Sequence, residues 1–201
     1  MSPDDSNPYI ALSDLALNLV LVLVFFVAAL VVIGRSGWED VKYKDAQQRV
    51  RLAVRDGLPE SLRPNNTPKN DPPGAQRWVF TNRQLFLEGQ QALSREGRRV
   101  LTDFAKILCR HPDWRRIRVE GHTRPPRPGE PDNWLLSAAR AAVVATAFTN
   151  DGGVKPYHVA VAGRAGQAPI DKKWPDNPSN ERVEIIIEYT TATSSTQPCY
   201  K

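Results

Sequence analysis

A single carboxylate, Asp14, lies in the most apolar stretch of this sequence, and an amide, Asn18, follows it one helical turn later. The stretch from Tyr9 to Ile33 carries no other charge, and at 1.5 Å per residue a helix of this length crosses a hydrocarbon core of about 30 Å. A carboxylate in hydrocarbon is costly, so such residues normally face a protein partner or a water-filled path. Burial also favours the neutral form of the acid, which would let Asp14 bind and release a proton. Asn18 shares its helical face, and Ser13 adjoins it.

Composition leaves a second interpretation of Asp14 open. Few apolar residues precede it, so it could equally be an interfacial residue or a helix N-cap. A secretory signal peptide is a weaker explanation of the segment, because MSPDDSN is acidic and the apolar run is too long. We therefore expect a retained transmembrane helix over residues 10–34.

The charge of the remaining chain is modestly basic, with 27 Lys and Arg against 22 Asp and Glu over the whole sequence. These residues are scattered and no recognition motif accompanies them, so we expect no nucleic-acid partner. The three histidines, His111, His122 and His158, have no nucleophile or metal-ligand spacing around them. We accordingly expect no enzyme activity, no cofactor and no metal, and a structural, hydrogen-bonding role for His122.

The two cysteines, Cys109 and Cys199, form no CxxC or Cys/His cluster. They could pair if the domain is exported. The composition around them favours another outcome, in which Cys109 is a small buried apolar residue and Cys199 belongs to a loose tail.

Composition divides the rest of the chain into four parts. Residues 35–62 predict a charged helix with a weak apolar stripe, suited to lying against a partner or a membrane rather than to building a core, and ended by Gly57-Leu58-Pro59. Residues 63–76 are rich in Pro and Asn and predict a linker. A globular domain follows at 77–190, and residues 191–201 have the composition of a disordered tail.

Within the globular part, the apolar periodicity predicts the element order ββαβαββ. Ser94 is the expected N-cap of the first helix, and Gly152-Gly153 the stop of the second. The strands are expected at 78–80, 85–88, 116–121, 158–163 and 182–189, and the helices at 95–108 and 133–149. The fold class is therefore α+β, a sandwich of two helices packed on a small mixed sheet.

Five segments of the chain carry a resemblance to a known family. VEGHT (119–123), NWLLSAARAAVV (133–144), GRAG (163–166) and NERVEI (180–185) resemble, in order and spacing, the signature of the OmpA-like peptidoglycan-binding domain, and FLEGQQALSREGRRVL (86–101) is similar to the stretch before its first helix. The form of the second motif looks most like that of MotB, the stator subunit of the flagellar motor. The resemblance covers about residues 78–189.

The resemblance implies a complete architecture for the chain. MotB proteins carry one transmembrane helix with an aspartate near its cytoplasmic end, then a plug helix, a linker and this domain. By that likeness, residues 1–9 lie in the cytoplasm, the transmembrane helix spans the bacterial inner membrane, residues 35–62 form the plug helix, and the domain lies in the periplasm. Asp14 would carry H⁺ through a channel built as a homodimer with a MotA-like multi-span partner. The positive-inside rule points the other way, since Arg35, Lys42 and Lys44 follow the helix and no basic residue precedes it; we follow the resemblance.

The chain also resembles ZorB of the Zorya anti-phage systems, whose partner is the MotA-like ZorA. Its compact length and altered pocket favour that defence branch over a flagellar stator. A third alternative is an OmpA-like envelope tether that conducts no ions.

The same likeness assigns a peptidoglycan site. In the family, an Asp after Gly-His-Thr and the Arg of Leu-Ser-x-x-Arg hold the diaminopimelate of the stem peptide. Arg140 matches that arginine, whose planar fork suits a carboxylate. Thr123, Asn133 and Leu136 match neighbouring pocket positions, and Arg182 is expected on the same basic rim. Without the resemblance, Arg140 could be an ordinary surface ion pair and Asn133 a helix N-cap.

Two positions of the site depart from the family pattern. Position 124 is Arg instead of the expected Asp, and Glu181 stands where another Arg is usual. Either Asp132 or Glu130 supplies the missing carboxylate, or the domain binds another part of the wall, or binds it weakly.

Overall fold

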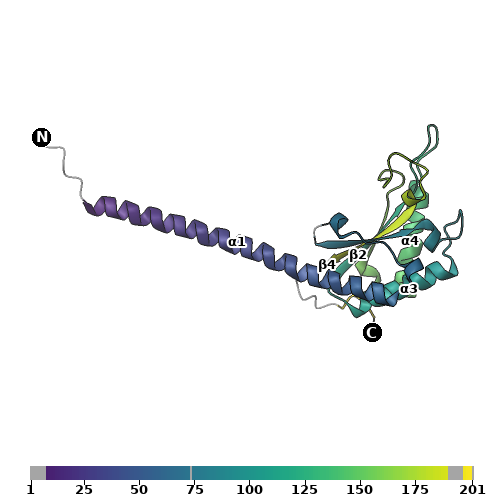
Figure 1. The fold of residues 1–201 in the computed structure, drawn as a ribbon, viewed down its shortest axis with the longest axis horizontal. Coiled ribbons are helices and arrows are strands. Elements are labelled where there is room, and N and C mark those ends of the chain that lie inside the picture. The colour runs from purple at the N-terminus through teal and green to yellow at the C-terminus, as the bar shows by residue number, and fades with distance from the viewer. Residues whose placement is uncertain (1–7, 73, 190–196, 201) are drawn as a thin grey trace. The chain divides into compact units, whose positions relative to one another are not determined.

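The structure, a computed structural model, describes residues 8–72, 74–189 and 197–200. It divides into two compact units, one up to Lys42 and one from Tyr43 onward. Helix α1 (Pro8–Gly57) contributes to both (Figure 1). The predictions for residues 1–7 and 190–196 lie outside the described residues.

The first unit contains an apolar helical segment, Leu12–Ile33, whose 22 residues are long and apolar enough to cross a membrane. None of the residues in its most apolar window is buried against the chain. A core helix of similar composition would be covered by its own domain, so this segment has the properties of a helix that needs another solvent or a partner.

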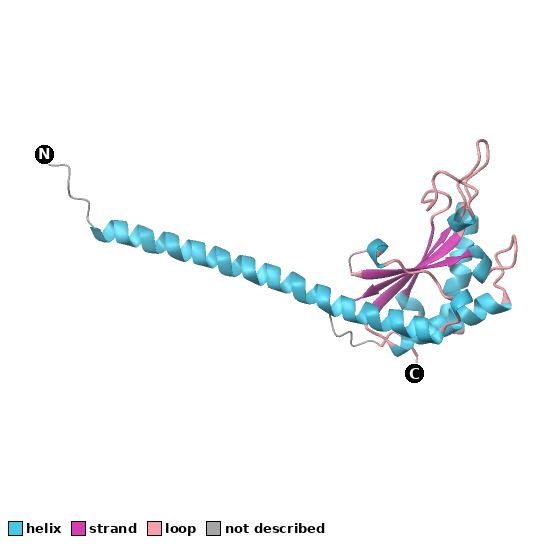
Figure 2. Ribbon diagram, viewed as in Figure 1, coloured by secondary structure: helices cyan, strands magenta, loops and turns pink. Residues whose placement is uncertain are grey.

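The second unit is built on a four-stranded sheet in the order β1-β4-β2-β3. Figure 2 shows its strands as magenta arrows. β4 is antiparallel to both β1 and β2, whereas β2 and β3 are parallel and connected through α4. The strands are β1 (Ala75–Thr81), β2 (Trp114–His122), β3 (Val159–Gly163) and β4 (Arg182–Tyr189). The helices are α2 (Asn82–Leu85), α3 (Arg95–Arg110) and α4 (Trp134–Asn150), with single 3-10 turns at Glu60–Leu62, Pro68–Asn70, Pro156–His158 and Pro178–Asn180. The predicted α+β class is confirmed.

Strand periodicity separates a core face of the sheet from a charged face. On β4, Val183, Ile185 and Ile187 are buried in the core, and the residues between them are largely charged. The core is completed by α3, α4 and an aromatic group in which Phe104 contacts Trp78, Phe80 and Phe148. The opposite face carries Arg and Glu side chains that line two of the three cavities described below.

Local signals explain the helix starts. Ser94 caps α3 as predicted, its hydroxyl accepting the Gly97 N–H at 2.8 Å. The strand predicted at 85–88 is wrong: Asn82–Leu85 is a helical turn. The reason is a capping box, in which the Thr81 N–H donates to the Gln84 side chain at 2.8 Å, a signal that outweighs a short apolar run.

The segment after the apolar helix builds part of the core, contrary to prediction. Ala46, Val50, Val54 and Leu58 are buried in it, because their spacing of four residues forms a narrow stripe that meets the other elements. The helix does end at Gly57.

The Pro/Asn-rich residues predicted as a linker also pack on the domain. Asn65 forms an isolated antiparallel β-bridge with Val79, and the Asp71 carboxylate accepts a hydrogen bond from the Arg77 N–H at 2.7 Å. Since the compact unit begins at Tyr43, the boundary predicted at residue 77 falls inside it.

The two cysteines form a disulfide, Cys109–Cys199. The prediction of a loose tail is therefore wrong for residues 197–200. Cys199 is buried and forms an isolated β-bridge with Val154, and the Tyr200 N–H donates to Gly153 O at 2.9 Å. Spacing along the chain could not show this pairing, because 90 residues separate the two thiols.

Candidate functional site

Arg140 is held inside the domain by the close approach of α4 to β2. Gly121 makes this approach possible, since a Cβ there would lie 2.0 Å from the Ser137 carbonyl oxygen. Only 4% of Arg140 is exposed, and its Nη1 lies 3.2 Å from Glu181 Oε2. Its guanidinium also lies over the Phe86 ring, 5.7 Å from the centroid. The alternative of an ordinary surface ion pair is therefore wrong, since the arginine is buried.

Glu181 opens onto a cavity of about 760 Å³, which we call the Glu181 cavity. Phe86 and the start of α2 form one wall, and the loop before β4 forms another. The charged residues that line it are Arg83, Glu88, Asp176 and Glu181. The Asn82 side-chain amide donates to Glu181 Oε2 at 3.3 Å. The cavity is thus acidic. Arg140 does not line it, but the Arg140 guanidinium is paired with Glu181, which does.

Arg124 is neutralised by neighbouring acids. Its Nη2 lies 2.8 Å from Glu130 Oε2, and its Nε lies 3.9 Å from Asp176 Oδ1. Hydrogen bonds from the Arg127 backbone and from Arg124 hold the pKa of Glu130 below its usual range. Glu130 therefore balances the arginine that replaced the family's Asp.

Asp132 holds two loops together. Its carboxylate accepts the Gly166 N–H at 3.1 Å and the Asn133 N–H at 2.9 Å, and also bonds the Gln167 side chain. Burial would raise the pKa of Asp132, but these hydrogen bonds lower it below its usual value. Neither Asp132 nor Glu130 lines the Glu181 cavity. The carboxylate that pairs with Arg140 is Glu181, whose position in the sequence indicated only a departure from the family pattern.

The other predicted pocket residues lie at the ends of β2 and α4. Thr123 is buried, and its N–H donates to Ala165 O at 2.9 Å. Asn133 precedes α4, but its side chain makes no capping hydrogen bond. Leu136 is half-buried on the first turn of α4.

Arg182 is the first residue of β4, and Glu181 directly precedes the strand. It donates to Glu184 Oε1 at 2.7 Å and to Ala168 O at 2.9 Å. Arg182 lines a separate cavity of about 690 Å³ together with His122, which we call the His122 cavity. Arg182 thus pairs with Glu184, whereas Arg140 pairs with Glu181, and a rim shared by the two arginines stays a prediction.

His122 is buried, yet neither ring nitrogen has a hydrogen-bond partner in the described part of the chain. Its Nε2 lies 3.6 Å from Glu184 Oε1 and 3.9 Å from Glu120 Oε2. Burial, assisted by the charge of Arg182, lowers the pKa of His122 to about 4. The predicted hydrogen-bonding role is thus wrong, and the imidazole is neutral at pH 7.

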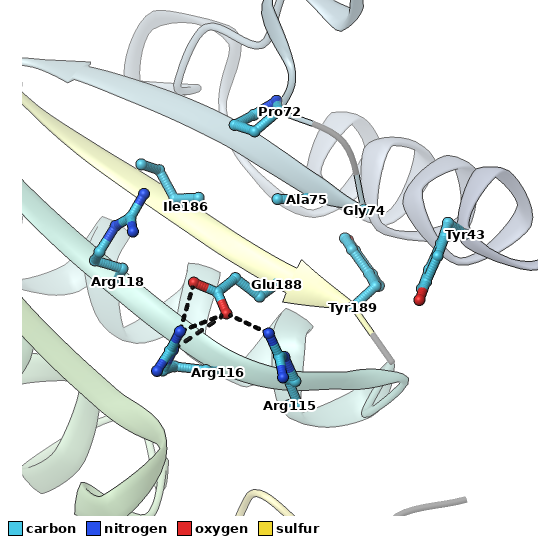
Figure 3. A pocket seen from close by; sticks show the side chains of 10 residues that line it. All are labelled: Tyr43, Pro72, Gly74, Ala75, Arg115, Arg116, Arg118, Ile186, Glu188 and Tyr189. Atoms are coloured by element: carbon cyan, nitrogen blue, oxygen red, sulfur yellow. Dashed lines mark hydrogen bonds and ion pairs between the residues drawn. The ribbon is translucent and has the colours of Figure 1, made fainter. Parts of the chain in front are cut away.

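A third cavity, of about 430 Å³, lies between Tyr43, β4 and β2 (Figure 3). Figure 3 shows Arg115 and Arg116 converging on the Glu188 carboxylate. The Arg116 guanidinium makes bonds of 2.9 and 3.1 Å to its two oxygens. These charges are satisfied within the domain, so this cavity is a weaker candidate than the Glu181 cavity.

Asp14 and Asn18 lie one turn apart on α1, and both are exposed. Ser13 donates its hydroxyl to Tyr9 O at 2.7 Å. In the described part of the chain Asp14 has no ion-pair partner.

Comparisons with known proteins agree on the domain. Residues 85–183 match the model of the OmpA family. Among curated proteins, the uncharacterized protein YtxE of Bacillus subtilis is 31% identical over 160 residues, which cover 77% of this chain and 65% of that protein. The chain thus spans slightly less than two thirds of that relative.

Solved structures share the fold. A MotB-like protein from Desulfovibrio vulgaris superposes with a TM-score of 0.61 at 20% identity, covering 76% of this chain and 94% of that one. The cell wall anchor of the T6SS from Pseudomonas aeruginosa gives 0.57 at 24% identity, covering 71% and 99%. The periplasmic domain of Helicobacter pylori MotB gives 0.52 at 21% identity, covering 60% and 86%.

Proposed function

We propose that this chain, whose residues 85–183 match the OmpA family, is a single-pass inner-membrane subunit that anchors a proton-driven complex to peptidoglycan. One observation carries the proposal: an apolar helix of membrane-spanning length, with Asp14 as its one charged residue, precedes this domain in the same chain. The helix supplies the proton site, and the domain holds the complex to the cell wall.

The disulfide supports a periplasmic domain. Disulfides persist in oxidising compartments such as the periplasm and are rare in the cytosol. The Cys109–Cys199 bond therefore favours export of the domain over the opposite orientation suggested by the basic residues after the helix. Large translocated domains are also less subject to that rule.

Asp14 acts as the proton carrier in this proposal. Its side chain is exposed in an apolar segment that carries no other charge, so it must meet partner helices or water inside a membrane. One helix cannot enclose a path by itself. We infer a homodimer of this subunit inside a MotA-like multi-span partner, with Asn18 on the same face of the path and Ser13 beside it.

The Glu181 cavity is the proposed wall-binding site. Compared with the family pattern, this chain has Arg124 where the family has Asp, and Glu181 where the family usually has Arg. The site therefore keeps one buried arginine and one adjacent carboxylate, 3.2 Å apart. In the bound state, Arg140 contacts a carboxylate of diaminopimelate and Glu181 contacts its ammonium, so the ligand replaces the internal ion pair.

Sedimentation with purified peptidoglycan tests the anchoring role, using the full chain in detergent. Arg140→Ala should lose most binding, whereas Arg110→Ala, an exposed arginine at the end of α3, should retain it. Unchanged sedimentation of Arg140→Ala would show that the Glu181 cavity does not bind the wall.

The exchanged charges at 124 and 181 favour a role in anti-phage defence, with a ZorA-like partner, over a flagellar stator. The neighbouring genes discriminate the two: helicase or nuclease genes beside a multi-span partner indicate defence, and flagellar genes indicate motility. A tether without ion conduction is the third candidate, and it predicts that Asp14→Asn leaves biological activity intact.

A further inference from the structure

The His122 cavity lies on the charged face of the sheet, away from the core. Its walls come from β1, β4, the end of β2 and the loop after β3. Its volume of about 690 Å³ falls within the range of small-ligand sites. The charged side chains that line it are Arg77, Arg164, Lys172, Arg182, Glu120 and Glu184. Cations outnumber carboxylates, so the cavity attracts anions.

The two carboxylates of the cavity are already paired. Glu184 contacts Arg182 at 2.7 Å and Arg77 at 3.2 Å. Glu120 contacts Arg118 at 2.8 Å. Although Glu120, His122 and Glu184 lie close enough together to ligate a metal, a divalent cation would have to displace these guanidinium groups and then lie among them. The charge balance disfavours a metal ion.

Two cations at the mouth of the cavity have capacity left. Arg164 is half-exposed and reaches Glu120 only at 3.9 Å. Lys172 has no ion pair with any residue that the structure describes. Gln167 and Ala168 lie between them on the same loop. Arg164 and Lys172 are therefore able to bind an incoming anion without breaking the pairs beneath them.

His122 provides the second sign of a ligand. A buried polar group is normally hydrogen-bonded, yet only 2% of His122 is exposed and both ring nitrogens lack a partner in the described chain. The ring lines the cavity with Arg182 and Glu184. A neutral imidazole carries one N–H donor, which an oxygen of a bound anion would satisfy.

We propose that the His122 cavity binds a carboxylate of the peptide part of peptidoglycan, as a second contact beside the Glu181 cavity. This inference rests on the proposed wall-binding function. Glu181 lines one cavity and Arg182, the next residue, lines the other. Because Glu181 directly precedes Arg182, the first residue of β4, the two cavities are close enough for stem peptides of the same wall segment to occupy both.

Sedimentation of the full chain in detergent with purified peptidoglycan tests the contact. The double variant Arg164→Gln/Lys172→Gln should bind about tenfold more weakly, the loss expected when one charge-assisted hydrogen bond is removed. The matched control, Lys106→Gln/Arg110→Gln, changes the net charge equally on the exposed side of α3 and should bind as the wild type does. Equal binding by both double variants overturns the inference.

The chemical source of the anion is resolved by two further arms. Amidation of the wall carboxylates should weaken the wild type and erase its difference from Arg164→Gln/Lys172→Gln. Inorganic phosphate is the competing source. If phosphate competes but amidation has no effect, the cavity binds phosphate and the inference fails.

The ring signals of the three histidines report occupancy independently of affinity. With soluble peptidoglycan fragments as the probe, the NMR signals of His122 should shift and those of His111 and His158 should not. A bound carboxylate would also raise the pKa of His122 from its value near 4. Shifts that persist in Arg140→Ala but vanish in Arg164→Gln/Lys172→Gln separate this cavity from the Glu181 cavity. An unmoved His122 beside wall binding that depends on Arg140 contradicts the inference and leaves the proposed function standing.

Discussion

Removing the disulfide should destabilise the folded unit by a large and calculable amount. Cys109 and Cys199 close a loop of 90 residues. In the chain-entropy model, a cross-link over a loop of that length lowers the entropy of the unfolded chain and so raises the free energy of unfolding by about 4 to 5 kcal/mol at 25 °C. For a unit of this size, each kcal/mol shifts the melting temperature by about 2–4 °C. Cys199→Ser should therefore lower the melting temperature by roughly 8–20 °C.

Thermal unfolding of the full chain in detergent, followed by circular dichroism, measures this effect. Cys109→Ser and the double serine variant should melt together with Cys199→Ser, because each removes the same covalent link. Reductant should lower the melting temperature of the wild type but not of the variants. If Cys199→Ser melts with the wild type, or if mass spectrometry finds both thiols free in protein from an exporting cell, the disulfide argument for a periplasmic domain is refuted.

Three further predictions concern the core, the buried histidine and the wall site. Val50→Ala should lower the free energy of unfolding by about 1–2.5 kcal/mol, because Val50 is fully buried. Leu52→Ala, on the exposed side of α1, should lower it by less than half of that. Equal losses for the two variants in denaturant unfolding would show that this segment does not belong to the core. The pKa of His122 is about 4 in the folded protein, against 6.5 for an unperturbed histidine in the unfolded chain. Between about pH 6.5 and 4 the unfolded state therefore binds more protons than the folded state. The free energy of unfolding should fall as the pH falls through this range, by roughly 3 kcal/mol in all. His122→Asn should flatten that part of the pH profile, and an unchanged slope would contradict the burial of a neutral imidazole. Glu181→Gln should weaken peptidoglycan sedimentation about tenfold if Glu181 binds the ligand ammonium; tighter binding would show instead that the glutamate only competes for Arg140.

Helices and strands were predicted well where a local sequence signal, such as an N-cap residue or an alternating apolar pattern, has one structural meaning. Ser94 capped α3, and the alternation over residues 182–189 marked β4. The strand predicted at 85–88 is wrong because Leu85 ends the helical turn that the capping box at Thr81 starts, and Phe86 forms only an isolated bridge with Leu93.

Long-range partners could not be predicted from the sequence. The stripe at Val50 and Val54 is too narrow to reveal whether it meets a membrane, a partner or its own domain, and the cysteines give no spacing that names their partner. At the site, Arg140 was found through the resemblance alone. Its partner, Glu181, looked like a defect in the motif until the fold brought the two side chains together.

Proton flux through the assembled complex tests the central claim most directly. The chain and its multi-span partner would be reconstituted in vesicles with a pH-sensitive dye inside, and flux would be compared among the wild type, Asp14→Asn and Asp14→Glu. The proposal predicts that Asp14→Asn abolishes flux although assembly and wall binding remain, and that Asp14→Glu, which keeps a titratable carboxyl, restores part of it. Wild-type flux in Asp14→Asn would contradict the proposal and leave this subunit as an envelope tether.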